Sequence, residues 1–191
     1  VGYQSPYTSE TWEWDGIAWQ QRQSANSPSP RRDFGLAYDA MRQRTVLFGG
    51  TESNNQPRND TFEWDGTDWT LRTPVHVPPV PLNSSDGVLG YDPQRGIVLY
   101  QYSAGSYQTW LWDGVDWTQF APGSQTQFTG IAWDPAGQRF VGHSHWGSGV
   151  LCELTATGWV SVPIAGCSMA PPAGELVSLP GQGMLVCASP T

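Results

Sequence analysis

One phrase of eight residues recurs four times along this chain and constrains its fold more than any other feature. It consists of two aromatic residues separated by one position, then Asp-Gly, two variable residues and a tryptophan, and its first copy runs from Trp12 to Trp19. The closing tryptophans stand at positions 19, 69, 117 and 159, which are 50, 48 and 42 residues apart. A repeat of this length, made of short strands and tight turns, is typical of β-propellers. We therefore predict an all-β propeller.

Each copy of the phrase predicts a β-hairpin, whose strands we name c and d. Asp-Gly between two strand-forming runs is a strong hairpin signal, because a type I′ turn needs positive φ, which glycine adopts without steric cost. We expect the repeated residues to pack blade against blade rather than to bind a ligand. They are Trp14, Asp15, Gly16 and Trp19 in the first copy, Trp64, Asp65, Gly66 and Trp69 in the second, Trp112, Asp113, Gly114 and Trp117 in the third, and Trp159 in the degraded fourth.

A second repeated phrase alternates with the first and predicts another hairpin, with strands a and b. It combines an alternating strand, a short polar turn that usually begins with Asp, and a continuous apolar strand. Its copies cover 34–50, 88–100, 131–141 and 176–186.

The order of the hairpins predicts how the ring closes. The chain starts with a cd hairpin at 9–22 and ends with an ab hairpin at 172–188. Pairing the two would complete a fourth blade, so we predict one domain over 1–191 with four four-stranded blades, at 33–72, 86–120, 128–162 and 172–191 joined to 1–22. A second interpretation stays open, because an exposed strand edge can also be covered by another copy of the chain.

The segment Val46-Leu-Phe-Gly-Gly50, followed by Trp64 and Trp69, resembles the kelch family of propellers, to which galactose-oxidase-type propellers are similar. That repeat carries an apolar strand ending in Gly-Gly and aromatic positions further on. The other copies replace the glycine pair at 101–102, 143–144 and 188–189. The resemblance implies the fold alone, and no copper site of the galactose-oxidase type can be mapped onto these residues.

Composition excludes several function classes. The net charge is −8, which argues against nucleic acid and against an anionic membrane surface as partners. All nine basic residues are arginines, so Schiff-base chemistry on lysine is excluded within this sequence. No apolar run approaches the roughly 20 residues needed to span a bilayer.

The connections between strands b and c and between strands d and a are longer and more varied than the a–b and c–d turns. Both sets of longer connections emerge on one side of the ring, here called the long-loop face, which we expect to bind ligands. The repeat departs most from its own pattern at 142–154. The candidate ligand-binding residues are Tyr102, Tyr107, His143, His145 and Trp146. Trp146 and the two tyrosines would stack on a sugar ring, or Trp146 simply covers the rim.

Two chemical motifs near this break are incomplete. His143 and His145 share one face of a strand and would suit a metal, but no third ligand is evident. Gly142-His-Ser-His-Trp146 lacks the second glycine of a serine-hydrolase elbow. We therefore predict no catalytic residues, no metal and no cofactor.

Three cysteines leave the disulfide pattern open. Cys167–Cys187 is one predicted pair, Cys152–Cys167 is its rival, and three ordinary thiols are the third interpretation. Asn59 and Asn83 lie in glycosylation sequons. Because the sequence begins at Val1, we expect a processed product or an excised piece. We also predict an extracellular or cell-surface location.

These observations predict a non-catalytic extracellular binding or scaffold module that acts through the long-loop face. Two alternatives stay open: a self-assembling structural subunit of a fibre or oligomer, with blades completed between chains, and a lectin-like propeller. The expected partners are a protein or glycan ligand, or copies of the chain itself, without nucleic acid or membrane insertion.

Overall fold

The structure is a computed structural model that describes residues 7–79, 87–103, 106–124, 126–144, 150–162, 174–179 and 183–188. In these residues every regular element is a strand, which confirms the all-β prediction. Three four-stranded antiparallel sheets follow one another along the chain. They consist of β4 (Gly35–Asp39), β5 (Arg44–Phe48), β7 (Thr61–Trp64) and β8 (Trp69–Arg72); of β9 (Gly87–Asp92), β10 (Gly96–Ser103), β11 (Ser106–Trp112) and β12 (Trp117–Ser124); and of β13 (Gly130–Asp134), β14 (Arg139–Ser144), β15 (Val150–Thr155) and β16 (Gly158–Val162).

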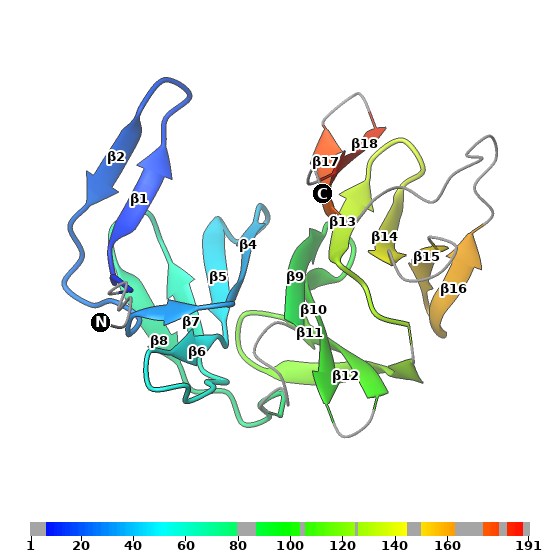
Figure 1. The fold of residues 1–191 in the computed structure, drawn as a ribbon, viewed down its shortest axis with the longest axis horizontal. Helices are drawn as coiled ribbons and strands as arrows, with labels where there is room; N and C mark the ends of the chain where they lie inside the picture. Colours follow the sequence, from blue (N-terminus) through cyan, green and yellow to red (C-terminus); the bar gives the residue numbers. More distant parts are fainter. Residues whose placement is uncertain are drawn as a thin grey trace, which may run out of the picture.

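Three further pairs of strands form two-stranded sheets. They are β1 (Thr11–Trp14) with β2 (Trp19–Arg22), β3 (Arg31–Arg32) with β6 (Thr51–Glu52), and β17 (Gly174–Leu179) with β18 (Gly183–Ala188). In Figure 1 the hairpins β1–β2 and β17–β18 stand at the two ends of a curved row of sheets. The two hairpins that the sequence predicts to share a blade therefore form separate sheets.

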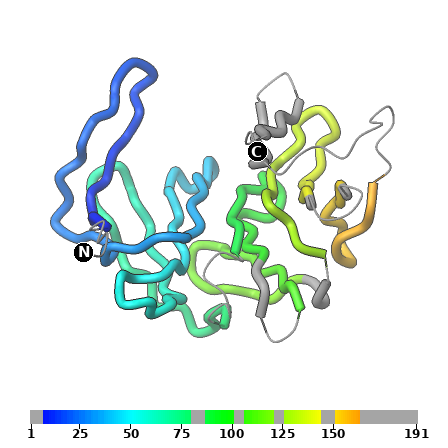
Figure 2. The backbone as a smooth tube through the Cα atoms, viewed as in Figure 1, coloured from blue at the N-terminus to red at the C-terminus, as the bar shows by residue number. Residues whose placement is uncertain are grey.

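The sheets stand side by side around their first strands. Strand β4 contacts β9, β9 contacts β13, and β13 contacts β17, so the a strands succeed one another along the inside of the curve (Figure 1). Figure 2 shows the chain passing through the sheets in sequence order. The cores lie between neighbouring sheets, as blade-on-blade packing requires: Val46 and Phe48 of the first sheet are buried with Ile97, Trp112 and Trp117 of the second.

The c–d hairpins form as predicted, but their turns are longer than a two-residue type I′ turn. In β1–β2 the last paired residues are Trp14 and Trp19, so a four-residue loop joins the strands. Gly16 has φ +98°, and one carboxylate oxygen of Asp15 accepts hydrogen bonds from the N–H groups of Ile17 and Ala18, at 2.8 Å each. The loops that begin at Asp65 and Asp113 repeat this arrangement. Aspartate thus closes the turn, while glycine supplies the positive φ.

The sequence predicts a long b–c connection at 102–108, but most of these residues belong to strands. Residues 102–103 and 106–108 extend β10 and β11, and Tyr102 lies opposite Tyr107 in the ladder. Tyr107 explains the extension, because its ring stacks on the buried ring of Tyr100 with centroids 5.3 Å apart. This part of the long-loop face is therefore a continuation of the sheet.

Candidate functional site

The structure places two of the five predicted ligand residues in the protein interior. His143 on β14 is 1% exposed and occupies the b-strand position of Phe48 and Tyr100, while Tyr107 on β11 is 9% exposed. His145 and Trp146 lie outside the described residues, and of Tyr102 only the backbone is described. A ligand site at these residues stays a prediction.

An aromatic cluster occupies the neighbourhood of His143 instead. Phe128 packs against Tyr100 and Trp159, with ring centroids 4.5 and 4.6 Å away. A Cβ atom on Gly142 would lie 2.7 Å from the ring of Phe128, so this ring fills the space that a side chain at Gly142 would need. The break in the repeat at 142 therefore has a packing explanation at this position.

The repeat tryptophans form a regular set of hydrogen bonds between successive sheets. The last residue of a c strand donates its indole N–H to a glutamate of the preceding c strand: Trp64 to Glu13 at 2.7 Å and Trp112 to Glu63 at 2.8 Å. In each of the three four-stranded sheets, the tryptophan at the start of the d strand donates to a threonine of the preceding c strand, two positions before Glu13, Glu63 or Leu111. These pairs are Trp69–Thr11, Trp117–Thr61 and Trp159–Thr109, at 2.7 to 2.9 Å. We call these contacts the indole bonds.

Glu63 is the most enclosed acceptor of this set. Its side chain is 1% exposed and accepts hydrogen bonds from Arg42 and Arg72 as well as from Trp112. Burial by itself would raise the pKa of Glu63, but the hydrogen bonds from Arg42 and Trp112 outweigh it and hold the pKa below the usual value. Two cations and an indole thus fix one buried carboxylate between two sheets.

Between the second and third sheets, leucines replace both the glutamate and the tryptophan of the indole bond. Leu111 replaces the glutamate of the second sheet, and Leu154 replaces the tryptophan of the third, where Leu111 packs against the apolar cluster that contains Leu154. A buried glutamate facing leucine would lose its donor, so the paired change leaves no polar group unsatisfied. The acceptors were missed at the sequence level, although Thr-x-Glu precedes Trp-Asp-Gly at Thr11 and at Thr61.

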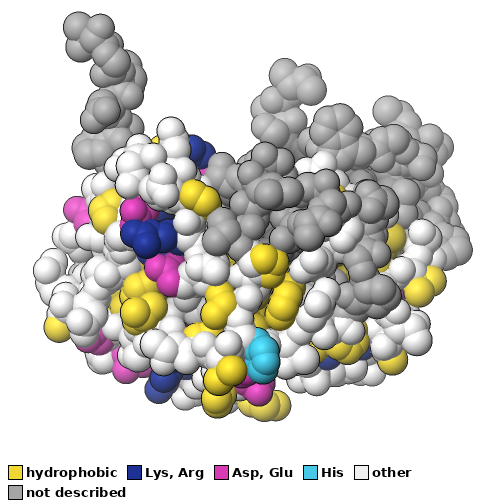
Figure 3. Space-filling view, turned by 90° about the horizontal axis from the view of Figure 1, so that it is seen from below, with side chains coloured by type: hydrophobic (Ala, Val, Ile, Leu, Met, Phe, Trp, Pro, Cys, Tyr) yellow, Lys and Arg dark blue, Asp and Glu magenta, His cyan; other side chains and the backbone are white. Residues whose placement is uncertain are grey.

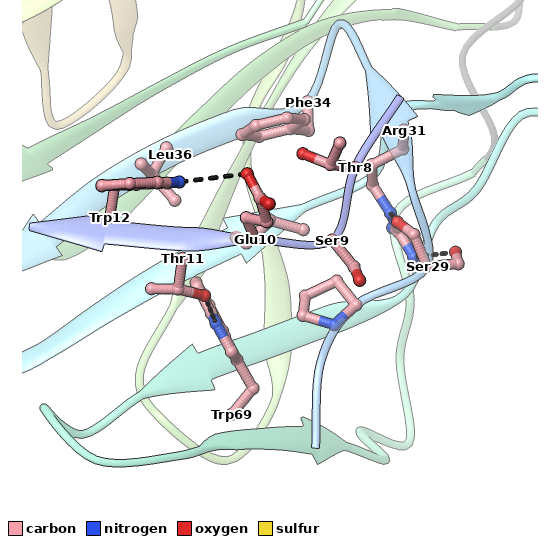
Figure 4. A pocket seen from close by; sticks show the side chains of 12 residues that line it. Thr8, Ser9, Glu10, Thr11, Trp12, Ser29, Arg31, Phe34, Leu36 and Trp69 are labelled. Carbon is pink, nitrogen blue, oxygen red and sulfur yellow. Dashed lines mark hydrogen bonds between the residues drawn. The ribbon is translucent and has the colours of Figure 1, made fainter. Parts of the chain in front are cut away.

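Strands β1 and β2 carry the same tryptophans, but no sheet among the described residues packs in front of them. Trp14 and Trp19 are 53% and 62% exposed, whereas Trp112 and Trp117 are at most 1% exposed. A pocket of about 170 Å³ lies beside β1, with an apolar wall that includes Trp12 and Leu36. Figure 4 shows Trp12 donating to Glu10 at its margin and Trp69 donating to Thr11. This exposed apolar surface is the strongest candidate for an interaction site in the described structure.

Cys152 is a buried free thiol, and burial raises its pKa. Cys167 and the side chain of Cys187 lie outside the described part, so their pairing stays a prediction, and so does glycosylation at Asn59 and Asn83. No three His, Cys, Asp or Glu side chains among the described residues gather as a metal site would require.

Acidic and basic side chains lie beside one another on the face of Figure 3, between small separate groups of hydrophobic ones. The described part of the chain contains no helix with the length and hydrophobicity needed to cross a bilayer. No protein-family model matches the sequence, and a comparison with curated proteins finds no match.

Proposed function

We propose that this chain is a non-catalytic binding or scaffold module, a four-bladed kelch-like propeller that works outside the cell through its long-loop face. One observation carries the proposal: the buried carboxylates of the repeat are engaged in holding strands and sheets together. Asp39, Asp92 and Asp134 accept turn N–H groups and each pairs with an arginine, and Glu63 joins two sheets. Residues that recur in several blades therefore build the scaffold, and the connections that differ between blades are left to recognise a partner.

The experiment is a binding screen of the purified chain against a glycan array and a displayed-peptide library. Two matched variants locate the binding face: Gln56→Arg, on an exposed β5–β7 connection, and Val115→Arg, in an exposed c–d turn on the opposite side. We expect a ligand whose affinity falls in Gln56→Arg and is unchanged in Val115→Arg. Silence in both screens, or loss of binding in Val115→Arg alone, would overturn the proposal.

Self-assembly is the second candidate, and the exposed tryptophans of β1–β2 favour it. A contiguous exposed apolar surface beside an unpaired strand edge is a common site of association between copies. The molecular mass in solution over a wide concentration range tests it, since a strict monomer at high concentration would eliminate this function.

A further inference from the structure

The indole bonds follow one direction around the row of sheets, and this direction predicts a missing neighbour for β1–β2. In each described case the donor belongs to the later sheet and the acceptor to the sheet before it. Trp14 stands at the donor position of Trp64 and Trp112, yet it is more than half exposed. A sheet that precedes β1–β2 in the ring is therefore expected to supply an acceptor.

The sheet β13–β16 carries a glutamate at the acceptor position. Glu153 on β15 occupies the position of Glu13 and Glu63, directly before the last residue of the c-strand motif. Its side chain is 37% exposed, and its one described ion pair, with Arg139, is long at 3.8 Å. In the second sheet this position is Leu111, and the residue that faces it in the third sheet is Leu154 instead of a tryptophan. A glutamate at this position of β15 therefore indicates that the next c strand in the ring carries a tryptophan. Leu151 of β15 stands at the position of the acceptor threonine. This strand therefore offers an acceptor to the indole of Trp14 but not to that of Trp19.

The inner strands indicate the second half of the missing neighbour. Leu89 and Tyr91 on β9 pack against the core that they share with the first sheet. The equivalent residues on β4, Leu36 and Tyr38, are 51% and 54% exposed. Since β4, β9, β13 and β17 succeed one another, the strand that would cover Leu36 and Tyr38 in a ring is β17.

Strand register then specifies how β18 would meet β1. In the complete sheets the second residue of β5 or β10 lies opposite the last residue of the c strand, as in Thr45–Trp64 and Ile97–Trp112. Applied to β18, the same register places Met184 opposite Trp14 and Cys187 opposite Thr11.

We propose that β1–β2 is completed by β17–β18 and β13–β16 of the same chain, with β18 paired to β1 in this register and the Trp14 indole donating to Glu153. We call the whole proposed interface of β1–β2 with β17–β18 and β13–β16 the seam. It rests on the proposed four-bladed ring and deepens it by naming the residues that close it. The same chain is the occupant because β17 already sits on β13 as the fourth inner strand, and a tethered partner has an effective concentration in the millimolar range.

The test introduces one cysteine at the seam, Thr11→Cys, in a Cys167→Ser background that leaves Cys187 without a competing partner. Directly opposed residues of antiparallel strands have Cα atoms about 4.5–5.5 Å apart, within the range for disulfides. Oxidised glutathione accepts the two electrons as the two thiols lose their protons and join. We expect a link within one chain between the introduced thiol and Cys187, found by peptide mapping and by mobility on a non-reducing gel.

Thr61→Cys in the same background is the matched control, because it removes an equivalent indole acceptor but lies opposite Phe48. A link between two chains, or no link beyond that of the control, would overturn the seam. Glu153→Leu adds a readout that needs no disulfide: we expect faster exchange of the Trp14 indole N–H, and unchanged exchange would also overturn the seam. The Gln56→Arg binding test is independent of both, so failure of the seam and failure of the proposed function are distinguishable.

Discussion

Strands β1–β2 and β11–β12 carry the same phrase but bury it differently. In β11–β12 the tryptophans at both ends of the Asp-Gly loop are enclosed and donate to the sheet in front, while in β1–β2 the same two positions are open to solvent. The loops themselves are alike, with a positive-φ glycine and an aspartate that accepts the same two N–H groups. The phrase therefore determines the hairpin, and the preceding sheet determines whether its tryptophans are buried.

The glutamates of the two regions differ in the same way. Glu13 accepts the indole of Trp64, which lowers its pKa more than any other contact, and its side chain is partly exposed beside Arg22. Glu63 lies between two four-stranded sheets, its own and the one that carries Trp112, and has two arginines around it. The same position is thus a surface acceptor in one region and a buried ionic junction in the other.

The largest predicted effect comes from removing the buried member of this pair. Glu63→Ala leaves two arginines and an enclosed indole N–H without their acceptor, so we expect a loss of about 3–5 kcal/mol in the free energy of unfolding. Glu13→Ala removes one indole bond and an exposed ion pair, and we expect about 1 kcal/mol. Urea denaturation of both variants measures the difference. Equal losses would mean that burial does not distinguish the two regions.

Removing one indole acceptor without changing side-chain shape should cost less. Thr61→Val keeps the volume but leaves the indole N–H of Trp117 unpaired in a buried site, so we expect a loss of about 1–3 kcal/mol. The control is Thr70→Val on the exposed side of β8, which should stay within about 0.5 kcal/mol of the parent chain. If both variants unfold at the same urea concentration, the Thr61–Trp117 bond does not stabilise the interface.

Alanine substitutions of two loop glycines distinguish the cost of local backbone strain from that of a clash between sheets. Gly66→Ala places a Cβ in open space at φ +95°, so only the backbone strain of about 1–2 kcal/mol applies. Gly114→Ala adds a Cβ 2.5 Å from Nη1 of Arg42, which is held by Asp39 and Glu63, so its loss of stability should be larger. Thermal unfolding of the two variants tests this order, and a more stable Gly114→Ala protein would contradict it.

The smallest predicted effect is a dependence on pH in one loop. The hydrogen bond from the Thr67 hydroxyl, with two backbone N–H groups, lowers the pKa of Asp65 from 3.8 to about 2. A carboxylate whose pKa is lower in the folded state stabilises the protein above pH 3.8 and loses this contribution as the pH falls through about 2.

Asp65→Asn keeps a side-chain oxygen acceptor but does not titrate. We therefore expect the parent chain to be more stable than this variant at neutral pH, and the difference in melting temperature to shrink as the pH is lowered towards 2. A difference that stays constant over this range would show that Asp65 does not contribute through its charge.

Much of the fold could be predicted from the sequence because it depends on local signals. Asp-Gly at 65–66 and 113–114 marks real hairpins, and the continuous apolar strands at 45–48 and 97–100 are central strands of four-stranded sheets. The extension of β10 and β11 could not be predicted, because it depends on the ring of Tyr107 stacking on Tyr100. Such a contact becomes visible only when the strands are paired.

The candidate site was harder to predict, because burial depends on the neighbouring sheet. His143 stands out in the sequence as one of a histidine pair, yet it fills a core position that phenylalanine and tyrosine occupy in the other sheets. Thr61 and Glu63 were not predicted as acceptors, since an isolated threonine or glutamate in a strand is ordinary. Only the distances between sheets reveal them as the acceptors of Trp117 and Trp112.

The central claim is that the repeat tryptophans are hydrogen-bonded links between successive sheets, and exchange of indole N–H protons with deuterium, followed by NMR, tests it most directly. The account predicts slow exchange for Trp64, Trp112 and Trp117, whose indoles donate to the sheet in front, and fast exchange for Trp12, which donates to the exposed Glu10. Exchange of Trp112 and Trp117 as fast as that of Trp12 would contradict it.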